Sequence, residues 1–287
     1  MTNNVLVLGA TGTVGCPLVA KLASQGVTVR GATRDPNRAA QMVGSAAEWI
    51  EFDLQRPESF AAALRGIDRV FMISRPGDDD ADQLAAPFVD ALRASGVQHV
   101  VNLSAMGTEQ RPEFSLRKVE LQIEASGIPH THLRPNFFMQ IHATGALCQA
   151  IRTTRRIALP AADAKLSFID ARDVAEVATR VLTDVRSNVN HAYTLTGPAA
   201  INYDQVAASL TAAVGQDVQY LPIDEAAARD MLLAAGFPDA HIARLLEMYR
   251  LVRLGACEPI SPDTAALLGR PPICFADFAA DYATCWK

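Results

Sequence analysis

Short apolar runs alternate with longer Ala- and Leu-rich stretches along the first half of the chain. The apolar runs have the length and β-branched content of buried strands, which we expect at Val5–Leu8, Val27–Thr33, Trp49–Phe52, Val70–Ile73, His99–Leu103 and Thr131–Leu133. The stretches between them have helical spacing, and helices are expected at Val14–Gln25, Pro57–Leu64, Asp82–Ser95 and Glu113–Ser126. This alternation predicts an α/β fold, a doubly wound parallel sheet covered by helices on both faces.

The rhythm of the sequence changes after Pro135. Up to Thr196 it predicts, in order, a helix, a strand, a helix that can pack on the sheet and a last strand, at Phe137–Ile151, Ser167–Ile169, Ala171–Leu182 and Tyr193–Thr196. From Tyr203 onward it is mainly helical, with helices expected at Asp204–Val214, Glu225–Ala235, Ile242–Leu254, Pro262–Leu268 and Phe275–Thr284. We therefore expect two domains. Residues 1–135 with 171–197 form the sheet domain, and residues 136–170 with 198–287 form a smaller, mainly helical lid at its carboxyl edge.

Composition narrows the class of protein. The 287 residues are 49% hydrophobic and 20% charged, which is ordinary for a globular chain that needs no disulfide or structural metal. A net charge of −5 disfavours nucleic acid as a partner, and the short basic stretch Arg152, Arg155 and Arg156 is expected to be solvated. Because no apolar run approaches the roughly 18 residues of a membrane span, we expect a cytoplasmic protein. The five cysteines form no CxxC pair and are expected to be reduced.

A glycine-rich turn follows the first expected strand directly. It reads Gly9-Ala10-Thr11-Gly12-Thr13-Val14-Gly15, and a helix begins inside it. Small residues let the backbone turn tightly and approach a pyrophosphate, while the helix N-terminus offers free N–H groups and the positive end of a dipole. A turn without a ligand is the alternative. Strand, turn and helix together favour a dinucleotide site in a Rossmann-type fold.

The residues after the second expected strand bear on the choice of dinucleotide. An acidic residue there would hold the ribose hydroxyls of NAD, whereas an arginine would pair with the 2′-phosphate of NADP. The chain has Thr33-Arg34-Asp35, with Arg38 one turn later. Arg34 follows the strand directly, and Asp35 stands before Pro36, where it can start a helix. NADP(H) is therefore favoured over NAD(H).

Eight segments carry a family resemblance: GATGTVG, TRDPNR, DLQRPESFAAAL, LSAMG, SGIPHTHLRPNFFMQ, FIDARDVAEVATRVL, YTLTG and LLGRPP. Through them the chain resembles the NmrA-like group of atypical short-chain dehydrogenase/reductases over almost its whole length. That group includes NADPH-dependent reductases of dyes and quinones as well as NmrA-type redox-sensing regulators. The resemblance implies a Rossmann-type NAD(P)-binding domain in residues 1–135 with 171–197, and a substrate domain in the remainder.

The resemblance also assigns residues to the cofactor by position. Those expected at the pyrophosphate are Gly9, Thr11, Gly12, Thr13, Val14 and Gly15; those at the adenosine end are Arg34, Arg38, Asp53 and Leu54; those toward the nicotinamide are Ser74, Arg75, Ser104, Pro135, Asn136 and Phe137. Phe137 also belongs to the expected substrate pocket, with Phe138, Met139, Gln140 and His142. The two phenylalanines can equally be core residues, and Gln140 and His142 can equally be surface residues.

One departure from ordinary short-chain dehydrogenases affects the chemistry. Those enzymes use a Tyr-x-x-x-Lys pair, in which lysine lowers the tyrosine pKa for proton transfer. No tyrosine here has a lysine four residues later, and the two positions fall on Pro112 and Leu116. Lys118 is shifted by two positions, which turns it to another helix face. Ser104 is left as a weak candidate for the catalytic proton donor.

The expected activity follows from that missing pair. A site without a strong general acid suits substrates that are already electrophilic, such as quinones, aromatic dyes and activated alkenes, because positioning against the nicotinamide supplies most of the acceleration. We expect an NADPH-dependent oxidoreductase acting on such small molecules, as a monomer or homodimer. The alternative is a non-catalytic, redox-sensing regulatory protein that binds NADP(H).

Two further clusters contain residue types that can bind metals. His130 and His132 alternate on an expected strand and share a face, but no third ligand lies near them in sequence. Asp78-Asp79-Asp80 precedes a helix, where negative charge is favoured by the helix dipole. No metal site is therefore expected.

Overall fold

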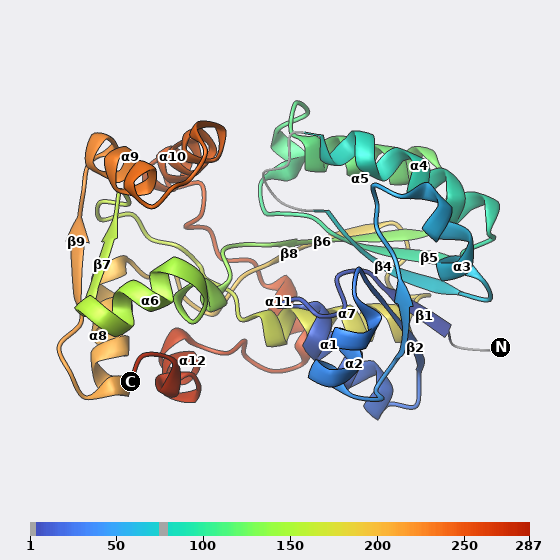
Figure 1. Ribbon diagram of the computed structural model, residues 1–287, viewed down its shortest axis with the longest axis horizontal. Coiled ribbons are helices and arrows are strands. Elements are labelled where there is room, and N and C mark those ends of the chain that lie inside the picture. The colour runs from blue at the N-terminus through green and yellow to red at the C-terminus, as the bar shows by residue number, and fades with distance from the viewer. Residues whose placement is uncertain (1–3, 75–79) are drawn as a thin grey trace. The chain divides into compact units, whose positions relative to one another are not determined.

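The chain forms two compact units in a computed structural model that describes residues 4–74 and 80–287 (Figure 1). Unit 1 comprises Met1–Pro135 and Ala171–Leu195, and unit 2 comprises Asn136–Asp170 and Thr196–Lys287. Each unit is built from segments that are separated in the sequence, because the chain leaves unit 1 after Pro135 and returns to it at Ala171.

The centre of unit 1 is a parallel sheet of seven strands within the described residues, in the order β3-β2-β1-β4-β5-β6-β8. The strands are β1 (Asn4–Val7), β2 (Thr28–Thr33), β3 (Glu48–Glu51), β4 (Arg69–Ile73), β5 (His99–Leu103), β6 (His130–Pro135) and β8 (His191–Leu195). The order reverses beside β1, because β2 lies on one side of it and β4 on the other. In open α/β sheets such a reversal point is where ligands bind at the carboxyl ends of the strands.

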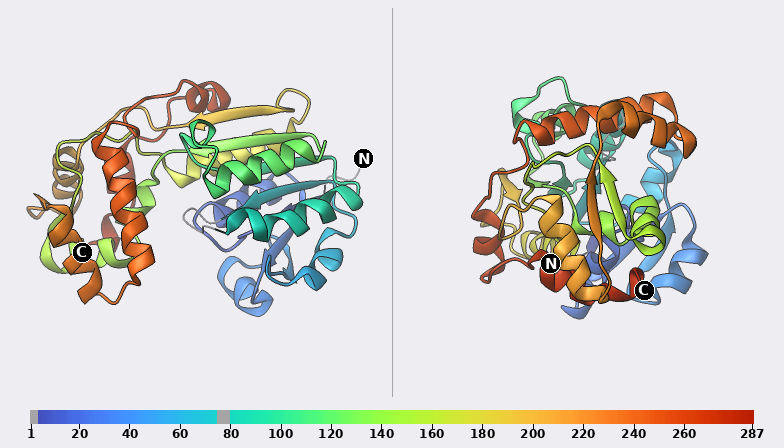
Figure 2. Two further views of the ribbon diagram at one scale, coloured as in Figure 1. Left: turned by 90° about the horizontal axis from the view of Figure 1, so that it is seen from above. Right: turned by 90° about the vertical axis from the view of Figure 1, so that its left-hand side faces the viewer.

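Helices cover both faces of this sheet (Figures 1 and 2). They are α1 (Gly15–Ser24), α2 (Pro36–Val43), α3 (Phe60–Leu64), α4 (Ala81–Ala94), α5 (Ser115–Ala125) and α7 (Ala171–Thr183), with short 3₁₀ turns η1 (Pro57–Ser59) and η2 (Thr108–Gln110). The α1 and α7 helices pack together, and α4 packs between α3 and α5. The rings of Phe52, Phe60 and Phe88 meet within 5.0–5.5 Å in the core beneath α3 and α4.

Unit 2 is mainly helical, with one pair of parallel strands (Figure 2). Its elements are η3 (Met139–His142), α6 (Gly145–Thr154), β7 (Arg156–Leu159), α8 (Tyr203–Val214), β9 (Gln219–Pro222), α9 (Glu225–Ala234), α10 (Asp239–Arg253), α11 (Asp263–Leu268), α12 (Phe275–Asp281) and η4 (Ala283–Cys285). Its core is aromatic. Phe168, Tyr203, Phe278 and Trp286 are all almost fully buried there.

The fold class predicted from the sequence is confirmed, with the helices and strands of unit 1 close to the expected bounds. Two predictions after Pro135 are wrong. The expected helix over Phe137–Ile151 is interrupted, since Phe138 pairs with Ile169 before η3 and α6 follow. The expected strand Ser167–Ile169 makes only one isolated bridge, between Ile169 and Phe138. The strands β7 and β9 were not predicted, and of the helix α2 only its start at Asp35–Pro36 was indicated.

Candidate active site

The glycine-rich turn connects β1 to α1 as predicted. Gly9 has a left-handed backbone (φ +62), and the Gly12 N–H donates to its carbonyl oxygen at 2.8 Å. Val14 occupies the N-cap of α1, where its apolar side chain forms no capping hydrogen bond, and the first turn contains no acidic residue. The N-terminus of α1 therefore retains its positive dipole end without an internal counter-charge, which suits an anion such as a pyrophosphate.

The glycines of this turn serve different purposes. A Cβ on Gly15 would lie 2.1 Å from the carbonyl oxygen of Gly9, so this residue permits the helix to pack against the turn. Gly12 is exposed, and a Cβ there would lie 3.1 Å from the same oxygen. Gly15 is thus required by the fold, whereas Gly12 keeps the outer surface of the turn low enough for a ligand to approach.

The residues after β2 are arranged as the sequence suggested. Asp35 caps α2, and its Oδ1 accepts a hydrogen bond from the Arg38 N–H at 3.0 Å. Arg34 and Arg38 are exposed, and neither forms an ion pair with any residue in the described ranges. Asp35 Oδ1 therefore serves as the cap of α2, while the guanidinium groups of Arg34 and Arg38 remain available to a phosphate.

Asp53 and Leu54 follow β3 in a tight turn and are half-buried. Asp53 Oδ1 accepts from the Gln55 N–H at 3.0 Å, and the Asp53 carbonyl accepts from the Ser59 hydroxyl at 3.2 Å. The Asp53 side chain thus shapes its own turn, which is a local role that sequence spacing does not disclose.

Two buried hydroxyl groups stand at the carboxyl edge of the sheet. Ser74 follows β4 and Ser104 follows β5, and the register of these strands pairs Ile73 with Leu103 immediately before them. Both serines are at most 5% exposed, and neither Oγ has a hydrogen bond of standard geometry with any described residue. Unsatisfied buried hydroxyls at this edge fit a polar ligand. Arg75, the expected neighbour of Ser74, lies outside the described residues.

Asn136 follows Pro135 at the end of β6 and is held within unit 2. Its side-chain amide donates to the Ser167 Oγ and to the Cys257 carbonyl, both at 2.8 Å. Both amide hydrogens are therefore used, and only the Oδ1 acceptor remains for a ligand. The half-buried Phe137 ring meets Phe168 edge-on, with centroids 6.5 Å apart, while Phe138 is also half-buried.

The other expected pocket residues are turned into the core of unit 2. Gln140 donates to Asp170 Oδ1 at 2.9 Å, and both side chains are buried. His142 is fully buried between the rings of Phe168 and Phe275, and burial lowers its pKa to about 4. Met139 lines a cavity of about 240 Å³ together with Phe168, Ile201, Gln205, Ser209 and Phe275.

The helix α5 has no tyrosine–lysine pair. Leu116 is buried, and Lys118 is about half exposed, with its Nζ 4.0 Å from Asp82 Oδ2 at the surface. Lys118 is thus a solvated lysine, as the helix geometry predicted, and it has no access to a buried general acid.

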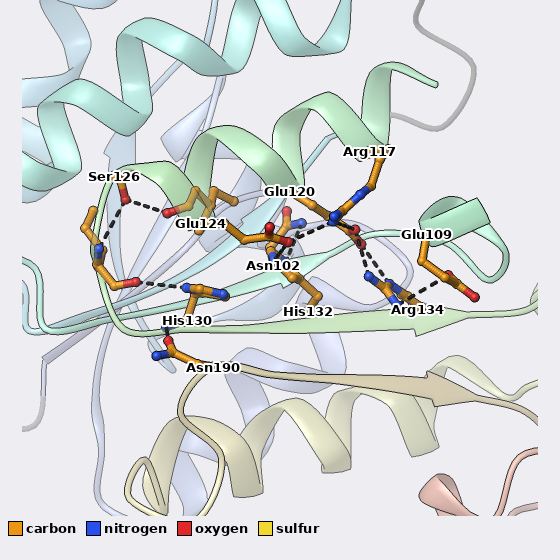
Figure 3. A network of polar contacts seen from close by, with 12 residues as sticks. Asn102, Glu109, Arg117, Glu120, Glu124, Ser126, His130, His132, Arg134 and Asn190 are labelled. Atoms are coloured by element: carbon orange, nitrogen blue, oxygen red, sulfur yellow. Dashed lines mark hydrogen bonds and ion pairs between the residues drawn. The ribbon is translucent and has the colours of Figure 1, made fainter. Parts of the chain in front are cut away.

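A buried charge network lies on the same helix and was missed by the sequence analysis (Figure 3). Arg134 of β6 donates to both oxygens of Glu120 at 2.9 Å, and Arg117 donates to Glu120 at 2.8 Å and to Glu124 at 2.7 Å. Arg134 also lies 3.3 Å from Glu109. A signal was present in the sequence, because Glu120 interrupts the apolar stripe of α5.

The electrostatics of this network follow from burial and from the neighbouring groups. Burial would raise the pKa of Glu120, but the Arg134 guanidinium and then the Ser104 hydroxyl outweigh it, so the pKa lies below its usual value. Burial lowers the pKa of His132 to about 4, against the opposing charge of Glu120. Glu120 is thus ionised and His132 neutral near pH 7.

The remaining candidate clusters are the histidine pair, the aspartate run and the cysteines. His130 and His132 lie with ring centroids 4.9 Å apart, and His132 Nδ1 is 3.3 Å from the Asn102 amide nitrogen. No group of three or more His, Cys, Asp or Glu residues within 4–74 and 80–287 is arranged to hold a metal ion. Asp78 and Asp79 lie outside those ranges. The five cysteines are free, and none of the described helices is both long and apolar enough to span a bilayer.

Comparison with known proteins finds one family and several similar proteins along nearly the whole chain. The model of the NmrA-like family matches residues 1–267. An NAD(P)H azoreductase from Xenophilus azovorans is 32% identical over 283 residues, covering 97% of this chain and 98% of the relative. A (4-alkanoyl-5-oxo-2,5-dihydrofuran-3-yl)methyl phosphate reductase from Streptomyces griseus is 32% identical over 285 residues, with coverage of 97% and 98%. The structure of Citrobacter sp. triphenylmethane reductase complexed with NADP(H) has a TM-score of 0.85 at 22% identity, covering 98% of this chain and 99% of that one.

Proposed function

The chain belongs to the NmrA-like family, and from this premise we propose that it is an NADPH-dependent reductase of small, electrophilic aromatic, quinone-like or activated-alkene molecules. The observation that carries the proposal is the glycine turn, where an exposed Gly12 adjoins the uncapped N-terminus of α1. The names of two relatives support the proposal, since one is an NAD(P)H azoreductase and the other is a (4-alkanoyl-5-oxo-2,5-dihydrofuran-3-yl)methyl phosphate reductase.

The residues of unit 1 fit a bound NADPH in three places. The turn from Gly9 to Gly15 would hold the pyrophosphate, and Arg34 with Arg38 would hold the 2′-phosphate. Ser74 and Ser104 would meet the nicotinamide end with their buried hydroxyls. When bound, NADPH supplies a hydride.

The same residues limit the chemistry that the site can perform. On α5, the buried Leu116 occupies the position of the lysine of a Tyr-x-x-x-Lys pair, and Lys118 lies at the surface. Without a strong acid, a ketone would have to develop an unprotected alkoxide, whereas a quinone or an electron-poor alkene delocalises the charge it receives. We therefore propose that unit 2, with the half-buried rings of Phe137 and Phe138, supplies an apolar surface for such substrates.

The test is NADPH oxidation against menadione, an azo dye, a butenolide and cyclohexanone. We expect turnover of the first three at rates at least about a hundredfold above that of cyclohexanone, because a missing general acid typically costs that much. Efficient reduction of cyclohexanone would contradict direct hydride transfer. NADPH binding without turnover of any substrate would favour the redox-sensing alternative. Oligomeric state stays a prediction of monomer or homodimer, checked by light scattering.

A further inference from the structure

Glu120 occupies a position that α5 otherwise gives to apolar side chains. Leu116, Val119 and Ile123 share its face of the helix, and all are buried with it. A buried carboxylate is costly unless it is ion-paired and hydrogen-bonded, so the groups around Glu120 indicate what it holds in place. Its side chain is 0% exposed.

The partners of Glu120 tie two neighbouring strand ends together. Arg134, which binds both Glu120 oxygens, is the last residue but one of β6 (Figure 3). The same guanidinium reaches Glu109 in η2, which belongs to the loop that begins at Ser104. The Ser104 N–H also donates to the Leu133 carbonyl at 2.8 Å. The backbone of Ser104 is therefore fixed between β6 and this network.

The Ser104 side chain stands beside the Arg134–Glu120 ion pair. The register that pairs Leu103 with Leu133 places Ser104 next to Arg134 on the same face of the sheet, and Arg134 binds both Glu120 oxygens. Ser104 is 3% exposed and its hydroxyl lacks a hydrogen bond of standard geometry to a described residue, yet it contributes, after Arg134, to lowering the pKa of Glu120. An ionised carboxylate has no hydrogen to donate and only accepts. The proton of the Ser104 hydroxyl is accordingly attracted toward Glu120.

We propose that Glu120 is a positioning residue that turns the Ser104 hydroxyl into a hydrogen-bond acceptor at the carboxyl end of β5. This inference rests on the proposed function. It predicts that Ser104 Oγ accepts a hydrogen bond from the bound nucleotide, donated by an N–H of the nicotinamide carboxamide. Ser104 then does not deliver the proton that the reduced substrate requires, and that proton comes from water. This role differs from that of the weak proton donor for which Ser104 is a candidate from sequence alone.

A proton-donor role would need a different neighbour. After giving up its proton, Ser104 would have to recover one from Glu120, but Glu120 is ionised and lies between two guanidinium groups. An acceptor role needs no proton from the carboxylate. It also accounts for a buried charge beside the site where an apolar residue would continue the helix stripe.

The test compares the binding of NADP⁺ with that of its 3-acetylpyridine analogue, in which a methyl ketone replaces the carboxamide and removes its N–H donors. We expect the wild-type protein to bind NADP⁺ about three- to tenfold more tightly, the worth of one neutral hydrogen bond. Ser104→Ala should abolish this preference and Ser104→Thr should retain it. Isothermal titration calorimetry measures both dissociation constants without any turnover.

Glu120→Gln is the decisive variant. Its amide oxygen would face the two arginines, so its N–H would donate to Ser104 Oγ, reverse the hydroxyl and abolish the preference. The double variant of Glu120→Gln and Ser104→Ala should bind NADP⁺ as tightly as either single variant, because the two changes remove the same interaction. Glu124→Gln is the matched control. Glu124 also binds Arg117, one turn further along α5, and this variant should keep the wild-type preference.

The outcomes separate the inference from the proposed function. A preference that survives Ser104→Ala, or that Glu124→Gln abolishes equally, overturns the assignment of Glu120 and Ser104. Wild-type protein that binds both nucleotides equally overturns the inference and leaves the proposed reductase standing. Failure to bind NADP⁺ at all overturns both. If Glu120→Gln does not fold, as judged by circular dichroism, the Ser104→Ala and Ser104→Thr pair still decides the acceptor role.

Discussion

Unit 1 and unit 2 treat the polar side chains near their functional segments differently. At the carboxyl edge of the sheet in unit 1, Ser74 and Ser104 are buried without standard hydrogen bonds to the described residues. In unit 2, Asn136 and Gln140 donate their amide hydrogens to neighbouring groups of the same unit, and among the described pocket candidates the one with an unpartnered atom, His142 at Nε2, is enclosed by aromatic rings. Polar groups that the fold leaves unsatisfied are available to a ligand, whereas satisfied ones hold the framework.

This difference explains why two predicted sets of residues have unlike surroundings. Among the residues proposed for the cofactor, Ser74 and Ser104 lie at strand ends and Gly12 lies at an uncapped helix N-terminus, and the polar groups there remain open. Those proposed for the substrate lie in a segment whose side chains build an aromatic core, and only Phe137 and Phe138 among them keep appreciable exposure. A binding role is thus easier to infer for unit 1 than for unit 2.

The largest expected effect tests whether the two units unfold independently. Trp286 is fully buried in unit 2, and its Nε1 donates to the His142 carbonyl at 2.7 Å. Trp286→Ala should cost about 4 kcal/mol of unfolding free energy through the cavity it leaves. The only remaining indole is then Trp49, in β3 of unit 1.

Urea unfolding of Trp286→Ala should therefore show two transitions. Far-ultraviolet circular dichroism should lose the signal of unit 2 first, while Trp49 fluorescence follows unit 1 at higher urea. Trp49→Phe, which leaves Trp286 as the reporter of unit 2, is the matched control. Coincident transitions in both variants would show that the units unfold as one cooperative body.

Gly15→Ala should be the next most damaging change, and its effect should fall on unit 1. The added Cβ would overlap the Gly9 carbonyl, so the turn or α1 must shift at a cost of about 3 kcal/mol. Gly12→Ala, at an exposed position with a 3.1 Å contact to the same oxygen, should cost less than about 1 kcal/mol. Thermal unfolding followed by circular dichroism compares the two, and equal losses would refute the distinction between these glycines.

Gly12→Val should separate binding from folding. Its side chain would project over the turn and keep an anion from the N-terminus of α1, so NADPH affinity should fall about a hundredfold, or roughly 2.7 kcal/mol. The circular dichroism spectrum should match that of the wild type. Calorimetric titration with NADPH measures the loss, and unchanged affinity would place the dinucleotide elsewhere.

Arg34→Ala should affect one cofactor and spare the other. Losing a charge-assisted phosphate contact costs about 1.5–3 kcal/mol, so NADPH binding should weaken tenfold or more while NADH binding stays nearly constant. Arg65→Ala removes an exposed positive charge elsewhere on unit 1 and serves as the control for general electrostatics. Equal losses for NADPH and NADH would contradict the assignment of Arg34.

The smallest expected effect concerns acid stability and is shared by both units. Burial lowers the pKa of His99 in unit 1 and of His142 in unit 2 to about 4, from 6.5. Between those values the unfolded chain binds protons that the folded chain does not, so stability is lost as the pH falls below about 6.5.

Replacing one of these histidines should flatten that pH dependence. His142→Phe, among aromatic rings that can accommodate it, should reduce the loss of stability at pH 6 by less than about 1 kcal/mol. Melting temperatures at pH 7.5, 6 and 5 measure the slope. An unchanged slope would indicate that other groups dominate the acid response.

The sequence predicted unit 1 well because its local signals agree with its tertiary structure. Buried parallel strands appear as short β-branched runs, and Gly9, Gly12 and Gly15 have a spacing that one turn geometry requires. The role of Asp35 as a helix cap was also visible from the following proline. In such regions, the type of each residue predicts its local backbone conformation.

Unit 2 was predicted less well because its elements depend on distant partners. The short strands β7 and β9 pair across more than fifty residues, and neither has an alternating pattern of its own. Phe138 leaves the helical path because it bridges to Ile169. The network around Glu120 was not predicted for a similar reason. A charged residue in an apolar stripe can be seen in the sequence, but its partner Arg134 lies on a different element and is not indicated by the residues around Glu120.

The discontinuity of unit 1 has a consequence during protein synthesis. The strand β8 pairs with β6, with His191 beside Thr131, and α7 buries its valines against the sheet, yet both elements are translated only after residues 136–170. Until then, β6 has an open edge with unpaired N–H and C=O groups, which can pair with another nascent chain. A gene fragment that ends at residue 135 would encode this open-edged intermediate permanently. Such a fragment should aggregate rather than serve as an independent nucleotide-binding module.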